Sequence, residues 1–147
     1  MGQVTASAER TIAAPADKVG TLVADYASTR PKILTDHYRE YQVLAGGSGA
    51  GTKASWTLQA TSKRSRDVVA TITEPAKGTV VETDGNSSMV TTWTVRPDGE
   101  SSVVRVETTW QGAGGIGGFF EGIFAPAGLK RIYDGMLGKL DELAAQG

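Results

Sequence analysis

The chain has 147 residues, 39% of them apolar, and its 15 Lys and Arg side chains nearly balance 16 Asp and Glu. This length fits one domain spanning residues 1–147, and no apolar run approaches the roughly 20 residues that a membrane-spanning helix needs. The even charge excludes an electrostatically driven nucleic-acid binder, and the absence of cysteine excludes disulfides and thiolate metal sites. The N-terminus lacks the pattern of a secretion signal, which predicts a cytoplasmic protein.

The first part of the chain predicts one strand and two short helices. Residues 4–12 alternate apolar or small residues with polar ones, as a half-buried strand does. Pro15 suits the first turn of a helix, because its missing N–H would be unpaired there anyway. The apolar stripe of this helix consists of Val19, Leu22, Val23 and Tyr26. Arg30-Pro31 interrupts the helix, and a second short helix is expected over residues 31–34.

Six further strands are predicted from alternation with a period of two. They cover residues 39–45, 52–60, 67–74, 79–84, 88–95 and 103–110. A glycine-rich loop over residues 46–51 separates the first two of them, and Arg96-Pro97-Asp98-Gly99 is a strong turn signal between the last two. Because these strands follow one another closely, we expect an antiparallel meander.

The last predicted element is an amphipathic helix. One alternative is that it begins near Phe119 and has a kink at Pro126. Its stripe at helical spacing consists of Leu129, Ile132, Tyr133, Met136, Leu140 and Leu143. Residues 112–117 match the G-x-G-x-x-G pattern, but a dinucleotide site also needs a parallel strand after the helix, and none is predicted. We interpret this segment as a hinge between sheet and helix. The alternative is a gate formed with Phe119, Phe120 and Phe124.

Three segments carry a resemblance to a known family. They are "VTASAERTIAAPADKVGTLVADY", "GTKASWTLQA" with "VVATITEPAKGTVVE", and "GLKRIYDGMLGKLDELAA". The first resembles the opening strand and helix start of the START and birch-pollen-allergen superfamily, and the second its paired strands ending in a Glu-Pro turn, here Glu74-Pro75. Bacterial members of that superfamily are described as polyketide cyclase/dehydrase-like, or SRPBCC, proteins. The chain departs from the family over residues 30–34, where the family commonly has an aromatic residue such as Trp.

The resemblance implies an α+β helix-grip fold. In that fold a curved, seven-stranded antiparallel sheet surrounds a long C-terminal helix, and two short helices lie between the first and second strands. The resemblance also implies a cavity between sheet and helix that takes an apolar small molecule.

The inward faces of the predicted strands carry large apolar side chains with two interleaved threonines. An apolar pocket with a few placed polar groups is typical of small-molecule sites, although a packed core is the alternative. We predict that the cavity is lined by Trp56, Leu58, Val68, Ile72, Met89, Thr91, Trp93, Val106, Thr108, Trp110, Phe120, Phe124, Ile132, Tyr133 and Met136.

Candidate catalytic groups are few. His37, the single histidine, lies beside Asp36, which would orient it as a general base. Neighbours on a strand point to opposite faces, which favours a surface histidine instead. With one histidine and no cysteine, we expect no metal and no cofactor. Three carboxylates, Glu82, Asp84 and Glu107, fall on strand faces assigned to solvent or left undetermined, and none has a clear claim on acid–base catalysis.

The leading hypothesis is binding of a hydrophobic or aromatic small molecule, a lipid or a polyketide-like metabolite, in the cavity. The alternative is an enzyme of the polyketide cyclase/dehydrase kind that uses the same cavity, with His37, Tyr38, Tyr133 and Thr108 as candidate catalytic residues. A third hypothesis is a dimerisation or partner-adaptor module that uses Phe119–Phe124. Monomer and homodimer therefore both stay open.

Overall fold

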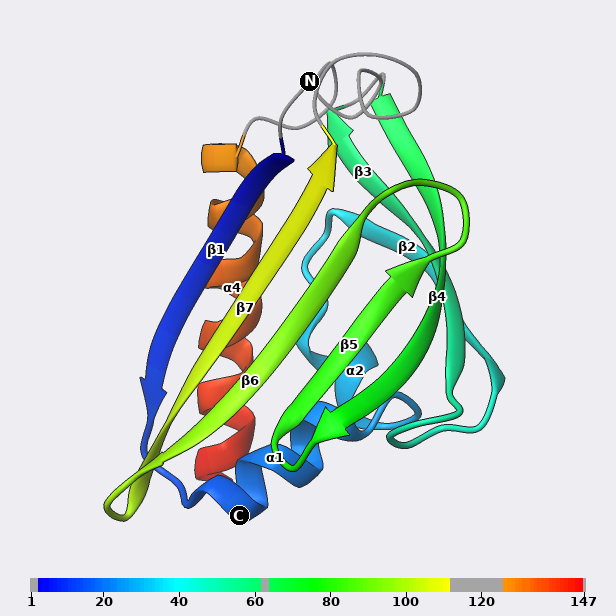
Figure 1. The fold of residues 1–147 in the computed structure, drawn as a ribbon. Coiled ribbons are helices and arrows are strands. Elements are labelled where there is room, and N and C mark those ends of the chain that lie inside the picture. The colour runs from blue at the N-terminus through cyan, green and yellow to red at the C-terminus, as the bar shows by residue number, and fades with distance from the viewer. Residues whose placement is uncertain (1–2, 62–63, 112–125, 147) are drawn as a thin grey trace.

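The computed structural model describes residues 3–61, 64–111 and 126–146, and these form one curved antiparallel sheet with three helices (Figure 1). The sheet has the strand order β1-β7-β6-β5-β4-β3-β2. The strands are β1 (Gln3–Ile12), β2 (Tyr38–Ala45), β3 (Lys53–Thr61), β4 (Arg64–Ala76), β5 (Thr79–Asp84), β6 (Val90–Asp98) and β7 (Ser101–Gln111). The helices are α1 (Ala16–Ala24), α2 (Thr29–Ile33) and α4 (Pro126–Ala145). The predicted helix-grip fold is confirmed, with α1 and α2 between β1 and β2.

One apolar core lies between the sheet and α4. The helix runs behind β1 and β7 and packs against β1, while α1 and α2 lie at the lower end of the sheet (Figure 1). Burial alternates residue by residue along β6 and β7, as a strand with one inward face requires. The buried residues of α4 are Leu129, Ile132, Tyr133, Met136, Leu137, Leu140 and Ala144. They join the inward residues of the strands in a single cluster.

Both short helices differ in their bounds from the predicted ones. α1 ends at Ala24 instead of continuing to Tyr26, because the Asp25 carboxylate accepts the backbone N–H groups of Ala27 and Ser28 at 3.1 and 2.9 Å. Such an Asx turn competes with helical hydrogen bonding. α2 begins at Thr29, ahead of the predicted start, which places its proline in the first turn.

The β4–β5 turn is held against β6 by its glycine. β4 runs through Pro75, beyond the predicted strand end, and its register with β5 shifts between Thr73 and Ala76, where proline cannot donate to the ladder. Gly78 has φ +80°, and a Cβ atom there would lie 2.8 Å from the Val95 carbonyl oxygen. The Val95 N–H also donates to the Gly78 carbonyl at 2.7 Å. Only a residue without a side chain allows this approach.

Two predictions fall on residues outside the described ranges. These are the hinge over residues 112–117 and the gate formed with Phe119, Phe120 and Phe124. Within the described residues the C-terminal helix begins at Pro126.

Candidate functional site

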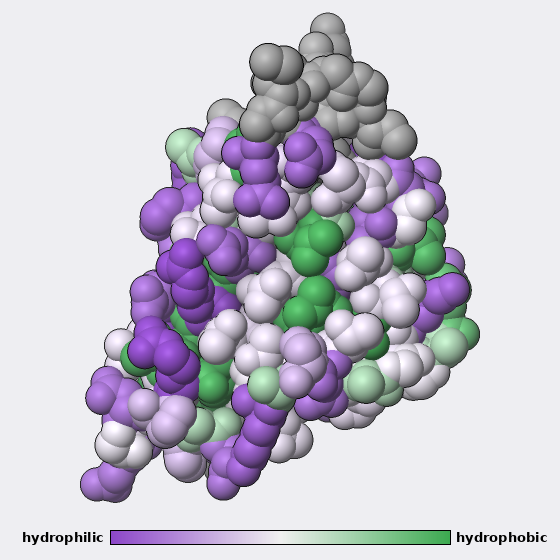
Figure 2. Space-filling model, in the orientation of Figure 1, coloured by the Kyte–Doolittle hydropathy of each residue, from purple (hydrophilic) through white to green (hydrophobic). Residues whose placement is uncertain are grey.

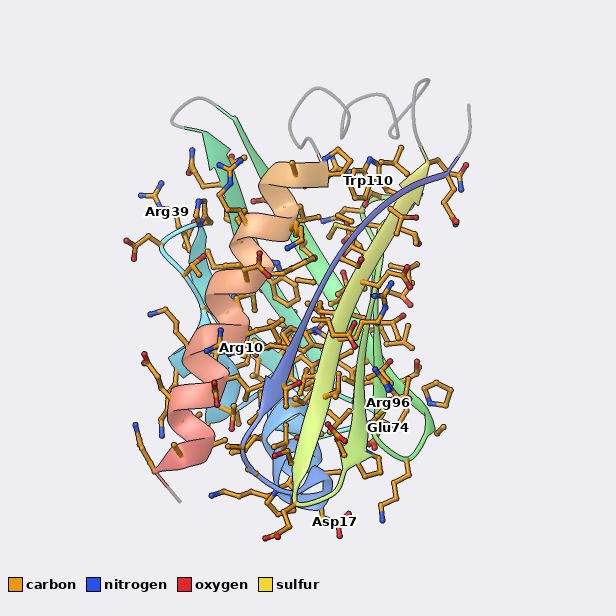
Figure 3. All side chains as sticks on the ribbon, turned by 90° about the vertical axis from the view of Figure 1, so that its left-hand side faces the viewer. Arg10, Asp17, Arg39, Glu74, Arg96 and Trp110 are labelled. Atoms are coloured by element: carbon orange, nitrogen blue, oxygen red, sulfur yellow. The ribbon has the colours of Figure 1, made fainter. Side chains whose placement is uncertain are left out.

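A small cavity lies between the sheet and α4, in a region that side chains otherwise fill (Figure 3). Its free volume is about 10 Å³, roughly the space that one water molecule requires. It is lined by Arg30, Tyr38, Trp56, Leu58, Glu82, Met89, Thr91, Trp93, Tyr133 and Met136. Apolar and aromatic walls with a few convergent polar groups are the usual composition of a small-molecule site.

A buried ion pair forms one wall of this cavity. Arg30 from α2 and Glu82 from β5 approach to 2.7 Å between Nη2 and Oε2, and their side chains are 4% and 6% exposed. The Tyr26 hydroxyl donates to the same Glu82 oxygen at 2.7 Å. The Arg30 guanidinium also lies 4.4 Å from the ring centre of Tyr26 and 4.9 Å from that of Trp93, so both rings stabilise its charge.

The electrostatics of this cluster keep Arg30 charged and Tyr26 neutral. Burial lowers the pKa of Arg30, but the charge and hydrogen bond of Glu82, together with Tyr26 and Tyr41, outweigh that effect and the pKa is raised, so Arg30 stays cationic. Burial, followed by the Glu82 charge, raises the pKa of Tyr26. The pair therefore brings one positive and one negative charge into the core, with a neutral phenol beside them.

A second polar group in the cavity is a chain of three hydroxyls. Thr91 and Thr108 hydroxyl oxygens lie 2.7 Å apart, and the Thr108 hydroxyl is also hydrogen-bonded to the Tyr133 hydroxyl. Burial raises the pKa of Tyr133 to about 12, so at neutral pH it is a hydrogen-bond donor and not a base. The chain links β6, β7 and α4 across the core.

Stacked aromatic side chains form the wall on the β2 and β3 side. Trp56 lies edge-on to Tyr38, with ring centres 6.4 Å apart, and is stacked on Tyr41 at 5.9 Å. Tyr38 keeps partial exposure as a residue, yet burial of its hydroxyl raises the pKa well above the ordinary value. The Tyr41 hydroxyl donates to the Tyr26 carbonyl at 2.6 Å and ties this wall to the end of α1.

The structure brings part of the predicted cavity lining together. Seven predicted residues line the cavity: Trp56, Leu58, Met89, Thr91, Trp93, Tyr133 and Met136. Six others are buried in the surrounding core: Val68, Ile72, Val106, Thr108, Trp110 and Ile132. Phe120 and Phe124 lie outside the described residues. A binding role for any of these residues stays a prediction.

The candidate histidine is placed at the start of β2, away from the cavity lining. His37 is half-buried, and its Nδ1 lies 2.9 Å from the Thr35 hydroxyl. Asp36, the predicted orienting carboxylate, is exposed. Of the other three catalytic candidates, Tyr38 and Tyr133 line the cavity, and Thr108 is buried in the core around it. Catalytic roles for these four residues stay predictions.

Sequence reasoning missed the ion pair. The sequence pattern leaves Glu82 and Asp84 on strand faces assigned to solvent or undetermined. In the structure Glu82 and Asp84 share the inward face with Val80, and both are buried. The one sequence signal for this ion pair is the departure from the family over residues 30–34. Arg30 lies in this segment, in which the family commonly has an aromatic residue.

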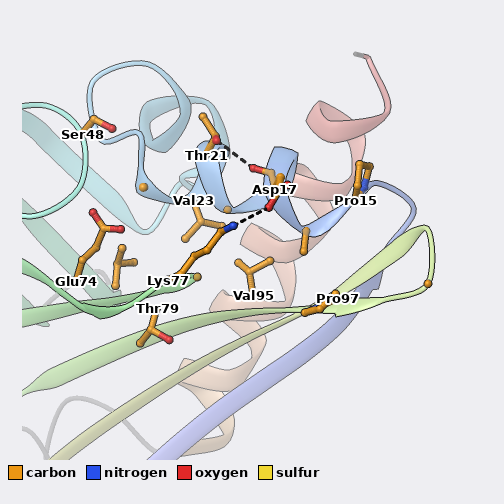
Figure 4. Close-up of a pocket in the computed structure, with 16 residues that line it drawn as sticks. Pro15, Asp17, Thr21, Val23, Ser48, Glu74, Lys77, Thr79, Val95 and Pro97 are labelled. Carbon is orange, nitrogen blue, oxygen red and sulfur yellow. Dashed lines mark hydrogen bonds and ion pairs between the residues drawn. The ribbon is translucent and has the colours of Figure 1, made fainter.

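A second, larger hollow lies outside the core beneath α1 (Figure 4). It encloses about 820 Å³ between α1, the β4–β5 turn and the β6–β7 turn. Lys77 reaches across it to Asp17 at 3.4 Å, and both side chains are well exposed. Val80 lines this cleft and pairs in the sheet with Trp93, which lines the inner cavity. The cleft and the cavity are therefore lined by adjacent, paired residues of β5 and β6.

The outer face of the sheet is mostly polar. Figure 2 shows hydrophilic and intermediate residues over β1, β7 and β6, with a small hydrophobic group at the centre. Among the described residues the only exposed large apolar side chain is Leu44, which is 49% exposed. No helix among them is long and apolar enough to span a bilayer. The phenylalanine segment of the adaptor hypothesis lies outside the described residues, so that hypothesis stays untested.

The comparison with protein families decides the assignment. The model of the family described as "polyketide cyclase / dehydrase and lipid transport" matches residues 3–145. The chain belongs to this family. The whole sheet and all of α4 fall within the match, so the polyketide cyclase/dehydrase and lipid transport domain accounts for the fold described above. No curated protein sequence matches the chain.

Solved structures of similar proteins agree with this family. The KanY protein, solved in solution by NMR, is 52% identical, with 99% of both chains covered and a TM-score of 0.89. The Zhui aromatase/cyclase from Streptomyces sp. R1128 is 16% identical, with 99% of this chain and 95% of that chain covered and a TM-score of 0.72. Norcoclaurine synthase from Thalictrum flavum, in complex with dopamine and hydroxybenzaldehyde, is 17% identical over 99% of this chain and 88% of that chain, with a TM-score of 0.71. The last two likenesses show a shared fold.

Proposed function

We propose that this chain binds a hydrophobic or aromatic small molecule in the cavity between the sheet and α4. The observation that carries the proposal is the lining itself, in which tryptophan and methionine side chains surround an arginine, three hydroxyls and a carboxylate. Membership of a family described by polyketide cyclisation and lipid transport supports it. Affinity arises mainly from apolar surface removed from water, at roughly 25 cal/mol per Å² before ordering costs.

Binding requires the cavity to widen. The free volume of about 10 Å³ holds no organic ligand, so side chains move aside when one enters. Met89 and Met136 are suited to this, because an unbranched thioether side chain has several rotatable bonds and packs against irregular surfaces. Both line the cavity, one from the start of β6 and the other from α4.

Native mass spectrometry of the protein purified from its own host tests the proposal, followed by denaturing extraction of any bound molecule. We expect a stoichiometric apolar or aromatic compound, and the same spectrum distinguishes monomer from homodimer. The compound is then titrated into the Met136→Trp variant, in which the larger ring occupies the cavity and abolishes binding. Lys139→Trp adds the same ring on the exposed face of α4 and leaves the affinity unchanged. Equal affinity in the two variants would place the ligand elsewhere.

A second candidate function is catalysis in the same cavity. The observation that favours it is the chain of hydroxyls from Thr91 through Thr108 to Tyr133, which ends beside a buried ion pair. A neutral phenol with a raised pKa donates a proton or a hydrogen bond to a carbonyl oxygen. For an enzyme, Tyr133→Phe lowers the turnover of the extracted compound while its affinity is retained. For a binding protein, the extracted compound is recovered unchanged after incubation with the wild type.

A further inference from the structure

The cavity wall contains buried hydrogen-bond donors that have no acceptor among the described residues. They are Trp56 Nε1 and Trp93 Nε1, and both residues line the cavity. The Arg30 guanidinium also lines the cavity, but its Nη2 lies 2.7 Å from Glu82 Oε2, so the ion pair already supplies its acceptor. No side-chain acceptor of the described lining residues is buried in this unpaired state. The unpaired side-chain groups of the described lining are therefore all hydrogen-bond donors.

A bound water satisfies these donors only while no ligand is present. The cavity has room for about one water molecule, which a ligand displaces when it enters. The ligand must then supply the acceptors that the water provided. A buried donor without an acceptor loses its hydration without compensation, so a ligand that supplies acceptors gains more here than its apolar surface alone provides.

The charge of the cavity restricts the kind of acceptor. Arg30 and Glu82 are the charged residues of the described lining, and their ion pair makes the total charge zero. A ligand carboxylate adds an uncompensated negative charge to this buried site and faces the Glu82 carboxylate. A ketone, ester or ether oxygen accepts hydrogen bonds from the same donors without adding a charge.

We propose that the cavity selects neutral molecules that carry oxygen acceptors on an aromatic or apolar frame, in preference to both carboxylic acids and plain hydrocarbons. This inference rests on the proposed binding function and adds the chemical class of the ligand. The two indole N–H groups select the acceptor, and Glu82 excludes the anion.

Three small probes of similar size separate these classes. Ethylbenzene has no oxygen acceptor, acetophenone has a neutral one, and benzoate has an anionic one. They are titrated into the ¹⁵N-labelled wild-type protein at pH 7.5 and followed by NMR. We expect acetophenone to bind about tenfold more tightly than either of the others, which corresponds to one net hydrogen bond. The indole N–H signals of Trp56 and Trp93 shift downfield with acetophenone and not with ethylbenzene.

Two variants test the individual groups. Trp56→Phe keeps an aromatic ring but removes a donor, so acetophenone affinity falls severalfold and ethylbenzene affinity is unchanged. Glu82→Gln removes the negative charge and retains the shape of the side chain. We therefore expect this variant to bind benzoate more tightly than acetophenone. The wild-type titrations decide the question even where Glu82→Gln is unstable.

The outcomes separate this inference from the function on which it rests. If none of the three probes binds and no compound co-purifies with the protein, the binding function itself is wrong. If ethylbenzene binds as tightly as acetophenone, the protein is a binder but the unpaired donors do not select its ligand. Tighter binding of benzoate to the wild type would show that the cavity accepts anions despite Glu82.

Discussion

Glu82→Gln is expected to lower the free energy of unfolding by about 3–5 kcal/mol, because it leaves the Arg30 charge buried and alone. At the observed separation of 2.7 Å, and with an effective dielectric constant of about 20, the attraction between the two charges is about 6 kcal/mol. Desolvation of both groups offsets most of this in the wild type. Once Glu82 is neutral, the desolvation of Arg30 remains without its compensation.

The decisive measurement is a double-mutant cycle with Arg30→Met, followed by urea unfolding and far-UV circular dichroism. Each single variant leaves one charge without its partner, whereas Arg30→Met/Glu82→Gln leaves none. We therefore expect the double variant to be more stable than either single one. Lys130→Met is the control, since its ion pair with Asp134 is about half exposed and contributes only about 0.5 kcal/mol. Additive losses in the cycle would show that the buried charges are not coupled and would refute the reasoning.

Two further predictions follow from the phenol in the core and from the β4–β5 turn. The pKa of Tyr133 is raised to about 12 by burial, so this phenol ionises first in the unfolded chain. Its contribution to stability is constant below about pH 9 and is lost between pH 10 and 12, by up to about 3 kcal/mol, in addition to the losses from Tyr26 and Tyr38, whose pKa values are also raised. Urea midpoints measured across that range check this, and Tyr133→Phe must show a smaller decline. Gly78→Ala is expected to cost about 1–3 kcal/mol more than Gly99→Ala, because both residues have positive φ but only Gly78 has a carbonyl 2.8 Å from the new Cβ atom. Equal losses in thermal unfolding would show that the close contact relaxes without cost.

Sequence patterns predicted the fold well where one periodicity dominates. The alternation in β3, β6 and β7 and the helical stripe of α4 each place apolar residues on one face, so their burial followed directly. The turn at Pro97 and Gly99 was equally clear, although β6 continues through Pro97 to Asp98. Element ends were less accurate, because single hydrogen bonds such as those accepted by Asp25 determine them.

The candidate site was harder to predict for a physical reason. Arg30 and Glu82 come from α2 and β5, and no local pattern records that two charges distant in sequence neutralise each other in a core. The free volume of the cavity depends on the rotamers of Trp93, Met89 and Met136 together, and composition does not define those. The aromatic lining was predictable from inward-facing positions, but the donor surplus required knowledge of which polar atoms find partners.

The pairing of the first strand with the last has a consequence for synthesis on the ribosome. β1 is paired with β7 along its whole length, from Gln3 with Gln111 to Ile12 with Ser102, and α4 packs against it. Both of its neighbours are therefore translated after the meander from β2 to β6, and the nascent β1 has no partner while that meander emerges. During that interval its unpaired backbone edge is open to chaperones or to other chains. Emergence of β7 and α4 from the ribosome, and not that of β1, then sets the moment at which this sheet is complete.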